Sequence, residues 1–239
     1  MNKKGLAIIT GASKGIGSAI AKGLAKDGYR VVLIARNISN LEKVSDTITN
    51  MNSNIPVPIL LPVDITDYAK LTAELKNITD QYGPINILVN SAAMFLDSSL
   101  NESVDNYRKI METNVVAQYA LLQTVVEIMK SQKSGYIFNI ASRAGKYGFP
   151  GGGIYGSTKF ALVGLTESLY RELAPIGIRI TSLCPGWVNT QMAKDAGTPF
   201  TDEEMIQPDD LLKTIQFLLN LSENVCVKEV VLEMKNSMI

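Results

Sequence analysis

Histidine is absent from this chain of 239 residues, and cysteine occurs only as Cys184 and Cys226. Without histidine, a Ser-His-Asp hydrolase site and a histidine-ligated zinc centre are excluded. The two cysteines have no C-x-x-C spacing, so we expect unpaired core thiols in a reducing cytoplasm. We predict no metal site, and any acid–base chemistry must depend on other side chains.

Excess charge of one sign and long apolar runs are also missing. The 23 Lys+Arg residues balance the 23 Asp+Glu residues, which leaves no basic field to attract nucleic acid. No apolar run approaches the length of a membrane span. The basic start, Met1–Lys4, precedes an apolar stretch that stops at Thr10 and is too short for a secretory signal. The sequence therefore predicts a cytoplasmic protein that has neither nucleic acid nor a membrane as partner.

Apolar, β-branched runs alternate with segments of helical periodicity along the chain. Seven such runs predict strands near 6–10, 30–36, 57–63, 85–92, 135–142, 178–184 and 229–234. This alternation predicts an α/β fold with a doubly wound parallel sheet and helices on both faces. The length suits one domain, 1–239, and no repeat, low-complexity tract or linker interrupts it.

A glycine-rich run, Thr10–Gly17, lies where the first predicted strand passes into a helix. Glycines permit a tight turn and let the backbone approach a pyrophosphate, while the helix N-terminus offers free N–H groups. A plain strand-to-helix turn is the alternative, but both the strand and the helix are present around the run. The candidate dinucleotide-binding residues in this run are Gly11, Ser13, Lys14, Gly15, Ile16 and Gly17.

The second predicted strand ends at Arg36, which is followed by Asn37. An acidic residue near this position would hold the ribose 2′-hydroxyl of NAD, but none is present. Arg36 and Lys14 suit a 2′-phosphate instead, because a guanidinium can bind phosphate in a bidentate manner and a lysine adds a point charge. We therefore predict NADP(H) as the cofactor. Two ordinary solvated surface cations are the alternative.

Two further strands end in residues that could border the same site. Asp64 and Ile65 follow the third strand, where the carboxylate could accept from the adenine amine or could cap the next helix. Asn90 and Ala92 end the fourth strand, where a cofactor could cross the edge of the sheet. For Asn90, an ordinary turn residue is the alternative.

Three residues suggest catalysis: Ser142, Tyr155 and Lys159. Ser142 ends the fifth strand, at the edge where open α/β sheets bind ligands. Tyr155 and Lys159 are spaced i and i+4 on the next helix and share one face. The ordinary pKa of tyrosine, ~10, is high for proton transfer, and we expect the ammonium of Lys159 to lower it. Tyr155 would be the general acid in reduction and the base in oxidation, with Ser142 binding the substrate oxygen. A chance pair on an amphipathic helix is the alternative.

In this order, the motifs resemble the short-chain dehydrogenase/reductase family over nearly the whole chain. The residues that carry the resemblance are Thr10–Gly17, Asp64, Asn90–Ala93, Asn114, Ser142, Tyr155, Lys159 and Pro185–Gly186. The resemblance implies a Rossmann fold and a catalytic tetrad of Asn114, Ser142, Tyr155 and Lys159. By spacing alone, Asn114 is a polar residue inside a long helix, 102–131. In relatives, this asparagine perturbs its helix and binds a water molecule that relays protons through the lysine.

The same resemblance implies further contacts with the cofactor. Pro185, Gly186, Val188 and Thr190 would pack on the nicotinamide, while Tyr155 and Lys159 would also touch the cofactor, Lys159 through the ribose hydroxyls. Two features depart from the family pattern. Ala93 stands where relatives usually have glycine, and the segment 230–235 is not followed by the usual glycine-rich tail.

The substrate would be bound by Met94, Phe95, the loop 144–153 and an amphipathic lid near 188–208. Methionine and phenylalanine there favour an apolar or flat carbonyl compound, although these side chains could pack only on each other. The predicted function is NADPH-dependent reduction of a 3-oxoacyl substrate, acyl-carrier linked or related, or of a small ketone. An NAD-linked alcohol dehydrogenase and a non-catalytic dinucleotide-binding sensor are the alternatives. The apolar helix 102–131 and the helix of Tyr155 suggest a homodimer or homotetramer, as in relatives.

Overall fold

The computed structural model describes residues 4–237. Residues 1–3, which form most of the basic start, and residues 238–239 lie outside the described part of the predicted domain. Seven strands make one sheet: β1 Leu6–Thr10, β2 Arg30–Ala35, β3 Ile59–Pro62, β4 Ile85–Asn90, β5 Gly135–Ile140, β6 Ile178–Pro185 and β7 Glu229–Leu232. The α-helices are α1 Gly15–Lys26, α2 Ile38–Thr49, α3 Tyr68–Tyr82, α4 Val104–Met111, α5 Ala117–Gln132, α6 Gly153–Leu173, α7 Gln191–Asp195 and α8 Pro208–Leu219.

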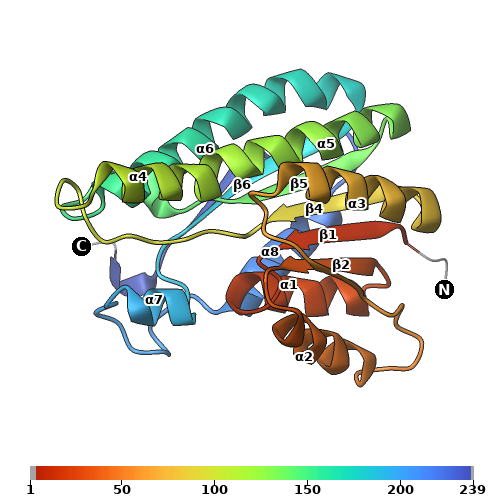
Figure 1. The fold of residues 1–239 in the computed structure, drawn as a ribbon, viewed down its shortest axis with the longest axis horizontal. Helices are drawn as coiled ribbons and strands as arrows, with labels where there is room; N and C mark the ends of the chain where they lie inside the picture. The colour runs from red at the N-terminus through yellow and green to blue at the C-terminus, as the bar shows by residue number, and fades with distance from the viewer. Residues whose placement is uncertain (1–3, 238–239) are drawn as a thin grey trace.

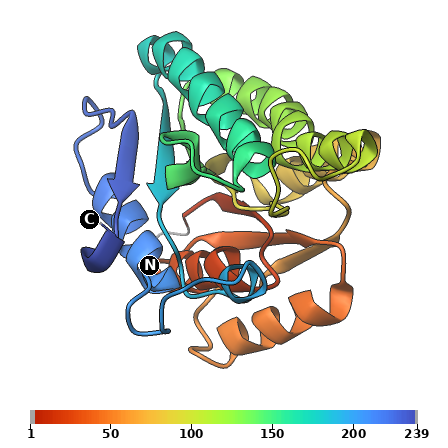
Figure 2. The ribbon, with the colours of Figure 1, turned by 90° about the vertical axis from the view of Figure 1, so that its left-hand side faces the viewer.

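All seven strands run parallel, in the order β3-β2-β1-β4-β5-β6-β7. Helices cover both faces: α3, α5 and α6 lie on one side of the sheet, and α1, α2 and α8 lie on the other (Figures 1 and 2). The predicted doubly wound Rossmann-like fold is confirmed.

Strand periodicity explains how one sheet supplies two cores. Successive side chains of a strand point to opposite faces. In β1, Ala7 and Ile9 therefore belong to the core beneath α1 and α8, while Leu6 and Ile8 belong to the core beneath α3 and α5. Because both faces are covered, these strands are apolar throughout instead of alternating with polar residues.

Several strands end one or two residues from their expected bounds, and one expected helix differs in kind. The third strand begins at Ile59 instead of residue 57, since Val57 is exposed and lies between two prolines, which disfavour strand pairing. The expected helix 102–131 is not continuous. A π-helical turn, Glu112–Val116, separates α4 from α5.

The strand order locates the site. Strands β1, β2 and β3 progress toward one edge of the sheet, whereas β4 to β7 progress toward the other, so the direction of winding reverses between β1 and β4. Ligands of open parallel sheets bind outside the carboxyl ends of the strands at such a reversal. Among the helices of residues 4–237, none combines the length and apolarity needed to cross a lipid bilayer.

Candidate active site

A cavity of about 1010 Å³ opens at the carboxyl ends of the central strands. Its wall is built from the loops that follow β1, β2, β3, β4, β5 and β6, together with α6 and α7. One end contains the glycine-rich loop and Arg36, and the other contains Ser142 and Tyr155. The sequence motifs for cofactor binding and for catalysis therefore meet in one continuous space.

The glycine-rich loop has the backbone geometry that a phosphate site requires. Helix α1 has no side-chain cap at its N-terminus and no acidic residue in its first turn, so its first N–H groups are free to bind an anion. Gly11 has φ +65° and packs so closely on the next loop that a Cβ would lie 3.0 Å from Ala92 Cα. Gly17 does not line the cavity; a Cβ there would lie 2.5 Å from the carbonyl oxygen of Gly11. Its role is close packing under the loop.

The predicted 2′-phosphate residues, Lys14 and Arg36, both line the cavity and are exposed. Asn37 also lines it, but its Oδ1 accepts from the backbone N–H of Asn40 at 3.1 Å and thereby caps α2. The side-chain oxygen of Asn37 is therefore occupied in capping α2. This structural role was not expected from the position of Asn37 next to Arg36.

At the end of β3, the structure excludes one of the two roles considered for Asp64. Its Oδ1 accepts from the backbone N–H of Thr66 at 3.0 Å and from Thr66 Oγ1 at 2.9 Å. Helix α3 begins at Tyr68 and is capped by Asp67, so Asp64 stabilises the preceding turn and does not cap the helix. Asp64 and Ile65 both line the cavity, as expected for an adenine subsite.

Asn90 lies beneath the cavity and does not line it. It is fully buried, and its Nδ2 donates to Asn139 Oδ1 at 2.9 Å, linking β4 to β5. Asn139 in turn donates to Thr166 Oγ1 on α6 at 2.8 Å. Asn90 therefore supports the loop above it, and the loop residue Ala92 is the one that lines the cavity.

Ser142, Tyr155 and Lys159 converge at the other end. Ser142 follows β5, and its Oγ accepts from the backbone N–H of Ala144 at 3.1 Å. Tyr155 lies in the first turn of α6, which begins two residues earlier than Tyr155, at Gly153. Lys159 is 1% exposed, yet it still lines the cavity with Tyr155. The expected i, i+4 arrangement on one helix face is present.

The protonation of this pair differs from the sequence-based expectation. Burial raises the pKa of Tyr155 to about 12, and a hydrogen bond with Ser142 opposes this effect. Burial also lowers the pKa of Lys159 to about 8. The expectation that Lys159 lowers the pKa of Tyr155 is wrong for the protein alone, because burial of the tyrosine dominates. Lys159 Nζ itself donates to the carbonyl oxygen of Ile140 at 3.0 Å. The low polarity around them disfavours the charged form of both groups, so Tyr155 stays protonated and neutral, while Lys159 keeps its charge only up to a pH of about 8.

Asn114 occupies the π-helical turn between α4 and α5 and is fully buried. Its side chain accepts from the N–H of Met94 and donates to the carbonyl of Met94, both at 2.9 Å. It also donates to Thr158 Oγ1 on α6 at 3.1 Å. Asn114 does not line the cavity, so it acts here as a tie between the loop after β4 and the helix that carries Tyr155.

The segment after β6 forms the remaining wall. Pro185, Gly186, Val188 and Thr190 all line the cavity, as the resemblance implied. The predicted lid, 188–208, contains the short helix α7 and then returns to its own start, where Val188 and Ile206 form a parallel β-bridge. Met192 lines the cavity from α7.

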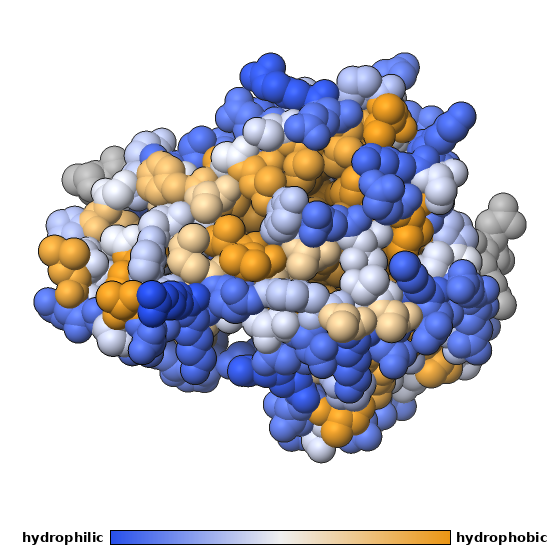
Figure 3. Space-filling model, turned by 45° about the horizontal axis from the view of Figure 1, so that its top comes forward, coloured by the Kyte–Doolittle hydropathy of each residue, from blue (hydrophilic) through white to orange (hydrophobic). Residues whose placement is uncertain are grey.

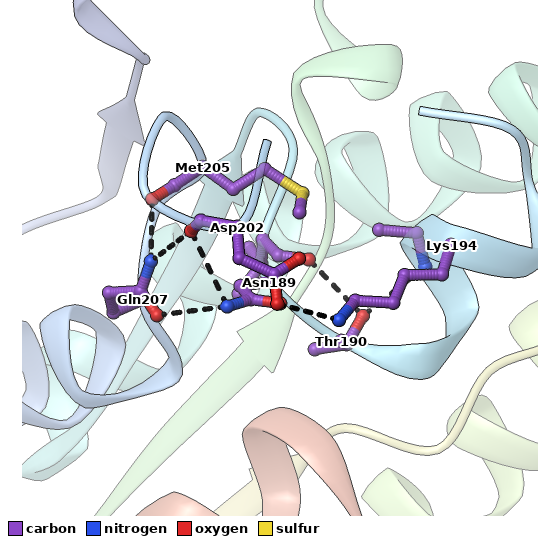
Figure 4. Close-up of polar contacts among 8 residues, drawn as sticks. Asn189, Thr190, Lys194, Asp202, Met205 and Gln207 are labelled. Carbon is purple, nitrogen blue, oxygen red and sulfur yellow. Dashed lines mark hydrogen bonds and ion pairs between the residues drawn. The ribbon is translucent and has the colours of Figure 1, made fainter. Parts of the chain in front are cut away.

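Polar contacts close the lid on itself (Figure 4). At its base, Gln207 Nε2 donates to the carbonyl oxygens of Asp202 at 2.7 Å and Met205 at 3.0 Å, and Asn189 Nδ2 donates to Gln207 Oε1 at 3.3 Å. Farther out, Lys194 Nζ forms an ion pair with Asp202 Oδ2 at 2.8 Å. Gly197 and Pro199 therefore lie in a loop whose two ends are joined by hydrogen bonds.

Some residues that shape the site were not among the predicted site residues. Trp187 and Lys109 line the cavity, and Gln118 and Thr10 hold the loop 91–94 from beneath it. For Gln118 a signal existed, because it is a polar residue in a helix that is apolar nearly all round.

The sequence profile of the short chain dehydrogenase family matches residues 5–199. The chain belongs to the short-chain dehydrogenase family. A relative in this family, an uncharacterised oxidoreductase of Staphylococcus epidermidis, is 33% identical over 95% of this chain and 96% of its own.

Two solved structures extend the comparison. A β-ketoacyl-[ACP] reductase from Bacteroides thetaiotaomicron is 68% identical, with a TM-score of 0.90 over 99% of both chains. ElxO, whose solved structure has NADP bound, is 27% identical, with a TM-score of 0.85 over 97% of both chains. This chain is accordingly an oxidoreductase of the short-chain dehydrogenase family.

Proposed function

We propose that this protein is an NADPH-dependent reductase that converts a carbonyl group to an alcohol. The observation that carries the proposal is the single cavity in which Ser142 and Tyr155 lie at one end and Lys14 and Arg36 lie at the other. A dinucleotide that extends between them would present its nicotinamide at the tyrosine and its adenosine phosphate at the two cations.

The cofactor site fits the groups that NADP(H) carries. The free N–H groups at the start of α1 suit the pyrophosphate, and Lys14 and Arg36 suit the 2′-phosphate. Asp64 and Ile65 border the expected adenine end. The NADP-bound state of ElxO and the identity with the β-ketoacyl-[ACP] reductase support this assignment.

The residues of the catalytic end each have a distinct task. When bound, the nicotinamide supplies a hydride to the carbonyl carbon. Tyr155 keeps its proton at neutral pH and donates it to the carbonyl oxygen, which completes the alcohol. Ser142 donates a hydrogen bond to the same oxygen and stabilises the negative charge that develops there. Lys159, buried below the tyrosine, supplies a cation within 5.5 Å of its ring centre.

The substrate end is apolar. Met94, Phe95, Phe149 and Met192 line it, and the ring of Phe95 meets that of Tyr155 edge to face, with centroids 5.0 Å apart. Such a wall suits an acyl chain or a flat ketone better than a sugar or a highly charged compound. We therefore infer a 3-oxoacyl substrate, acyl-carrier linked or related, or a small ketone. The β-ketoacyl-[ACP] reductase neighbour favours the first.

An oligomer belongs to the proposal as well. Apolar side chains gather over α5 and α6 on one face of the molecule (Figure 3). From α4 through α6, the large apolar residues that are more than a third exposed include Val104, Tyr107, Val116, Tyr119 and Phe160. A second copy that covers this face would bury them, giving a homodimer or homotetramer. Light scattering that finds only monomers at micromolar concentration would contradict this part of the proposal.

Loss of NADPH absorbance against a panel of ketones tests the proposed reaction. The panel contains a 3-oxoacyl thioester, a 3-ketoester, a vicinal diketone, a pteridine ketone and a 3-keto acid, each with NADPH and with NADH. We expect turnover with NADPH that vanishes in Tyr155→Phe. Faster turnover with NADH would favour an NAD-linked dehydrogenase. Tight NADPH binding without turnover of any panel member would favour a sensor.

A further inference from the structure

The loop 91–94, which lines the cavity after β4, is held by three side chains from different elements. Thr10 Oγ1 accepts from the N–H groups of its first two residues, each at 3.0 Å. Asn114 binds both backbone groups of its last residue. The third side chain is Gln118 on α5, whose Nε2 donates to the carbonyl oxygen of Ala92 at 2.9 Å. Thr10 and Asn114 belong to family motifs, whereas Gln118 does not.

The hydrogen bonding of Gln118 shows which of its two amide atoms makes the important contact. The residue is 1% exposed, and its Oε1 is buried without a hydrogen-bond partner among residues 4–237. An unpartnered buried oxygen costs free energy, and an apolar side chain of the same length would avoid that cost. If the side-chain amide were rotated by 180°, Oε1 would face the carbonyl oxygen of Ala92. Both atoms are hydrogen-bond acceptors, so this orientation is unfavourable. The bond from Nε2 to Ala92 is therefore the contact that an apolar side chain could not replace.

Ala92 is the point where the loop meets the glycine-rich run. A Cβ built on Gly11 would lie 3.0 Å from both the nitrogen and the Cα of Ala92. Gly11 and Ala92 thus form adjacent parts of one wall, and both line the cavity. Any shift of Ala92 toward Gly11 would displace the loop that binds the pyrophosphate, since no space separates them.

We propose that Gln118 is a positioning residue for the cofactor. It holds the carbonyl of Ala92 so that the wall shared with Gly11 keeps its shape. The inference rests on the proposed function, because it takes NADP(H) to bind against this wall.

Because of its position, Gln118 should affect cofactor binding without affecting the catalytic step. Asn114 holds Met94 independently, next to the Phe95 ring that meets Tyr155. Loss of the Gln118 amide should disturb the wall at Ala92 and leave the tyrosine side in place. We therefore expect weaker NADPH binding with little change in kcat, a split that a general loss of stability would not produce.

The test compares Gln118→Met with Gln123→Met. Methionine matches the length of glutamine but cannot donate to Ala92. Gln123 lies on the same helix, is exposed, and bonds only to Tyr119 Oη among the described residues, at 3.2 Å. Trp187 is the only tryptophan in the chain and lines the cavity, so its fluorescence reports NADPH binding directly. The measurements are the NADPH Kd, the KM for NADPH, kcat and Tm.

We expect Gln118→Met to raise the Kd and KM for NADPH about tenfold, while kcat falls less than about threefold and Tm does not decrease. Gln123→Met should match the wild type. A wild-type Kd in Gln118→Met would overturn the inference, as would a lower Tm with unchanged Kd. If Gln118→Met does not fold, Gln118→Leu takes its place with the same criteria. Wild-type protein that binds no NADPH would overturn the proposed function, and this inference with it.

Discussion

Lys159 Nζ donates to the carbonyl oxygen of Ile140 at 3.0 Å and lies 5.5 Å from the centre of the Tyr155 ring. The lysine is thus anchored to the end of β5 beneath the tyrosine. Burial makes both groups reluctant to ionise, with a pKa of about 8 for Lys159 and about 12 for Tyr155. Between pH 8 and 12, the lysine of the protein alone is mostly neutral and the tyrosine is still protonated. The lysine therefore titrates before the tyrosine, which affects both the reaction rate and the stability.

The pH profile of reduction should follow Lys159. Tyr155 retains its proton far above neutral pH, so the supply of the acid does not limit the reaction there. The cation of Lys159 is lost as the pH rises through about 8. Because kcat/KM for NADPH reports ionisations of the free enzyme, we expect it to fall above about pH 8. Initial rates between pH 6 and 10 give the profile. A Lys159→Arg variant should lose this inflection, and a flat wild-type profile to pH 10 would contradict the assignment.

The buried charge of Lys159 should also make the folded protein less stable at neutral pH. Its folded pKa, about 8, lies below the ordinary value of 10.5, so folding is penalised in full below pH 8. The penalty fades as the pH rises toward 10.5, where the lysine is neutral in both states. The penalty amounts to about 3 kcal/mol, and loss of the hydrogen bond to Ile140 offsets about 1–2 kcal/mol of it. We therefore expect Lys159→Met to be more stable than the wild type by about 1–2 kcal/mol at pH 7, with about 2–4 °C in Tm for each kcal/mol. Thermal unfolding at pH 7 and pH 10 measures the difference.

The difference between the two proteins should shrink at pH 10. A Lys159→Met variant that is less stable than the wild type at pH 7 would show that the hydrogen bond to Ile140 outweighs the burial of the charge. The comparison with one variant cancels the other titrating groups, because they are common to both proteins.

Most of the fold could be predicted because it depends on local pattern. A parallel strand covered on both faces is an uninterrupted apolar run, and runs such as 30–35 and 135–140 are easy to recognise between helical segments. Arg36 could be assigned to the site for the same reason, since it follows β2, the neighbour of β1, at the carboxyl edge where open parallel sheets bind ligands. Tyr155 and Lys159 could be paired because their contact is set by helix geometry alone.

The rest depends on contacts between distant parts of the chain. The π-helical turn at 112–116 changes the helix by one residue, a change that the apolar periodicity does not register. Gln118 contacts Ala92, 26 residues away, and no local pattern predicts that bond. The pKa of Tyr155 depends on how many atoms of other elements surround it, so the i, i+4 spacing from Lys159 predicted the wrong direction.

Cofactor preference should depend on Arg36. A guanidinium gives a charge-assisted, bidentate contact to a 2′-phosphate that NADH does not carry. We expect Arg36→Ala to raise the KM for NADPH about tenfold or more and to change the KM for NADH less than about twofold. The matched control is Arg171→Ala, since Arg171 is also exposed but pairs with Glu167 on the surface of α6. Steady-state rates with NADPH and with NADH give the two KM values for each variant. Equal effects on the two would mean that Arg36 stabilises the loop without contacting the phosphate.

The ion pair between Lys194 and Asp202 should control how the lid holds the substrate. The 2.8 Å pair joins α7 to the returning segment of the lid, and both side chains are about half exposed. An exposed pair contributes only about 0–1 kcal/mol to overall stability, so its loss should leave Tm nearly unchanged. The lid itself is a small unit fastened at its base, and a contribution of this size can shift its opening.

We therefore expect Lys194→Met to raise the KM for the carbonyl substrate about two- to fivefold without lowering kcat, since an exposed pair of this kind contributes at most about 1 kcal/mol. Salt provides the sharper test. In the wild type, added NaCl screens the exposed pair and should raise the KM, whereas Lys194→Met should have lost this dependence. The control, Lys213→Met, breaks a similar exposed pair with Asp210 on α8, outside the lid, and should retain it. Equal salt dependence in all three proteins would show that the pair does not influence the lid, and that the contacts of Gln207 at the base hold it closed instead.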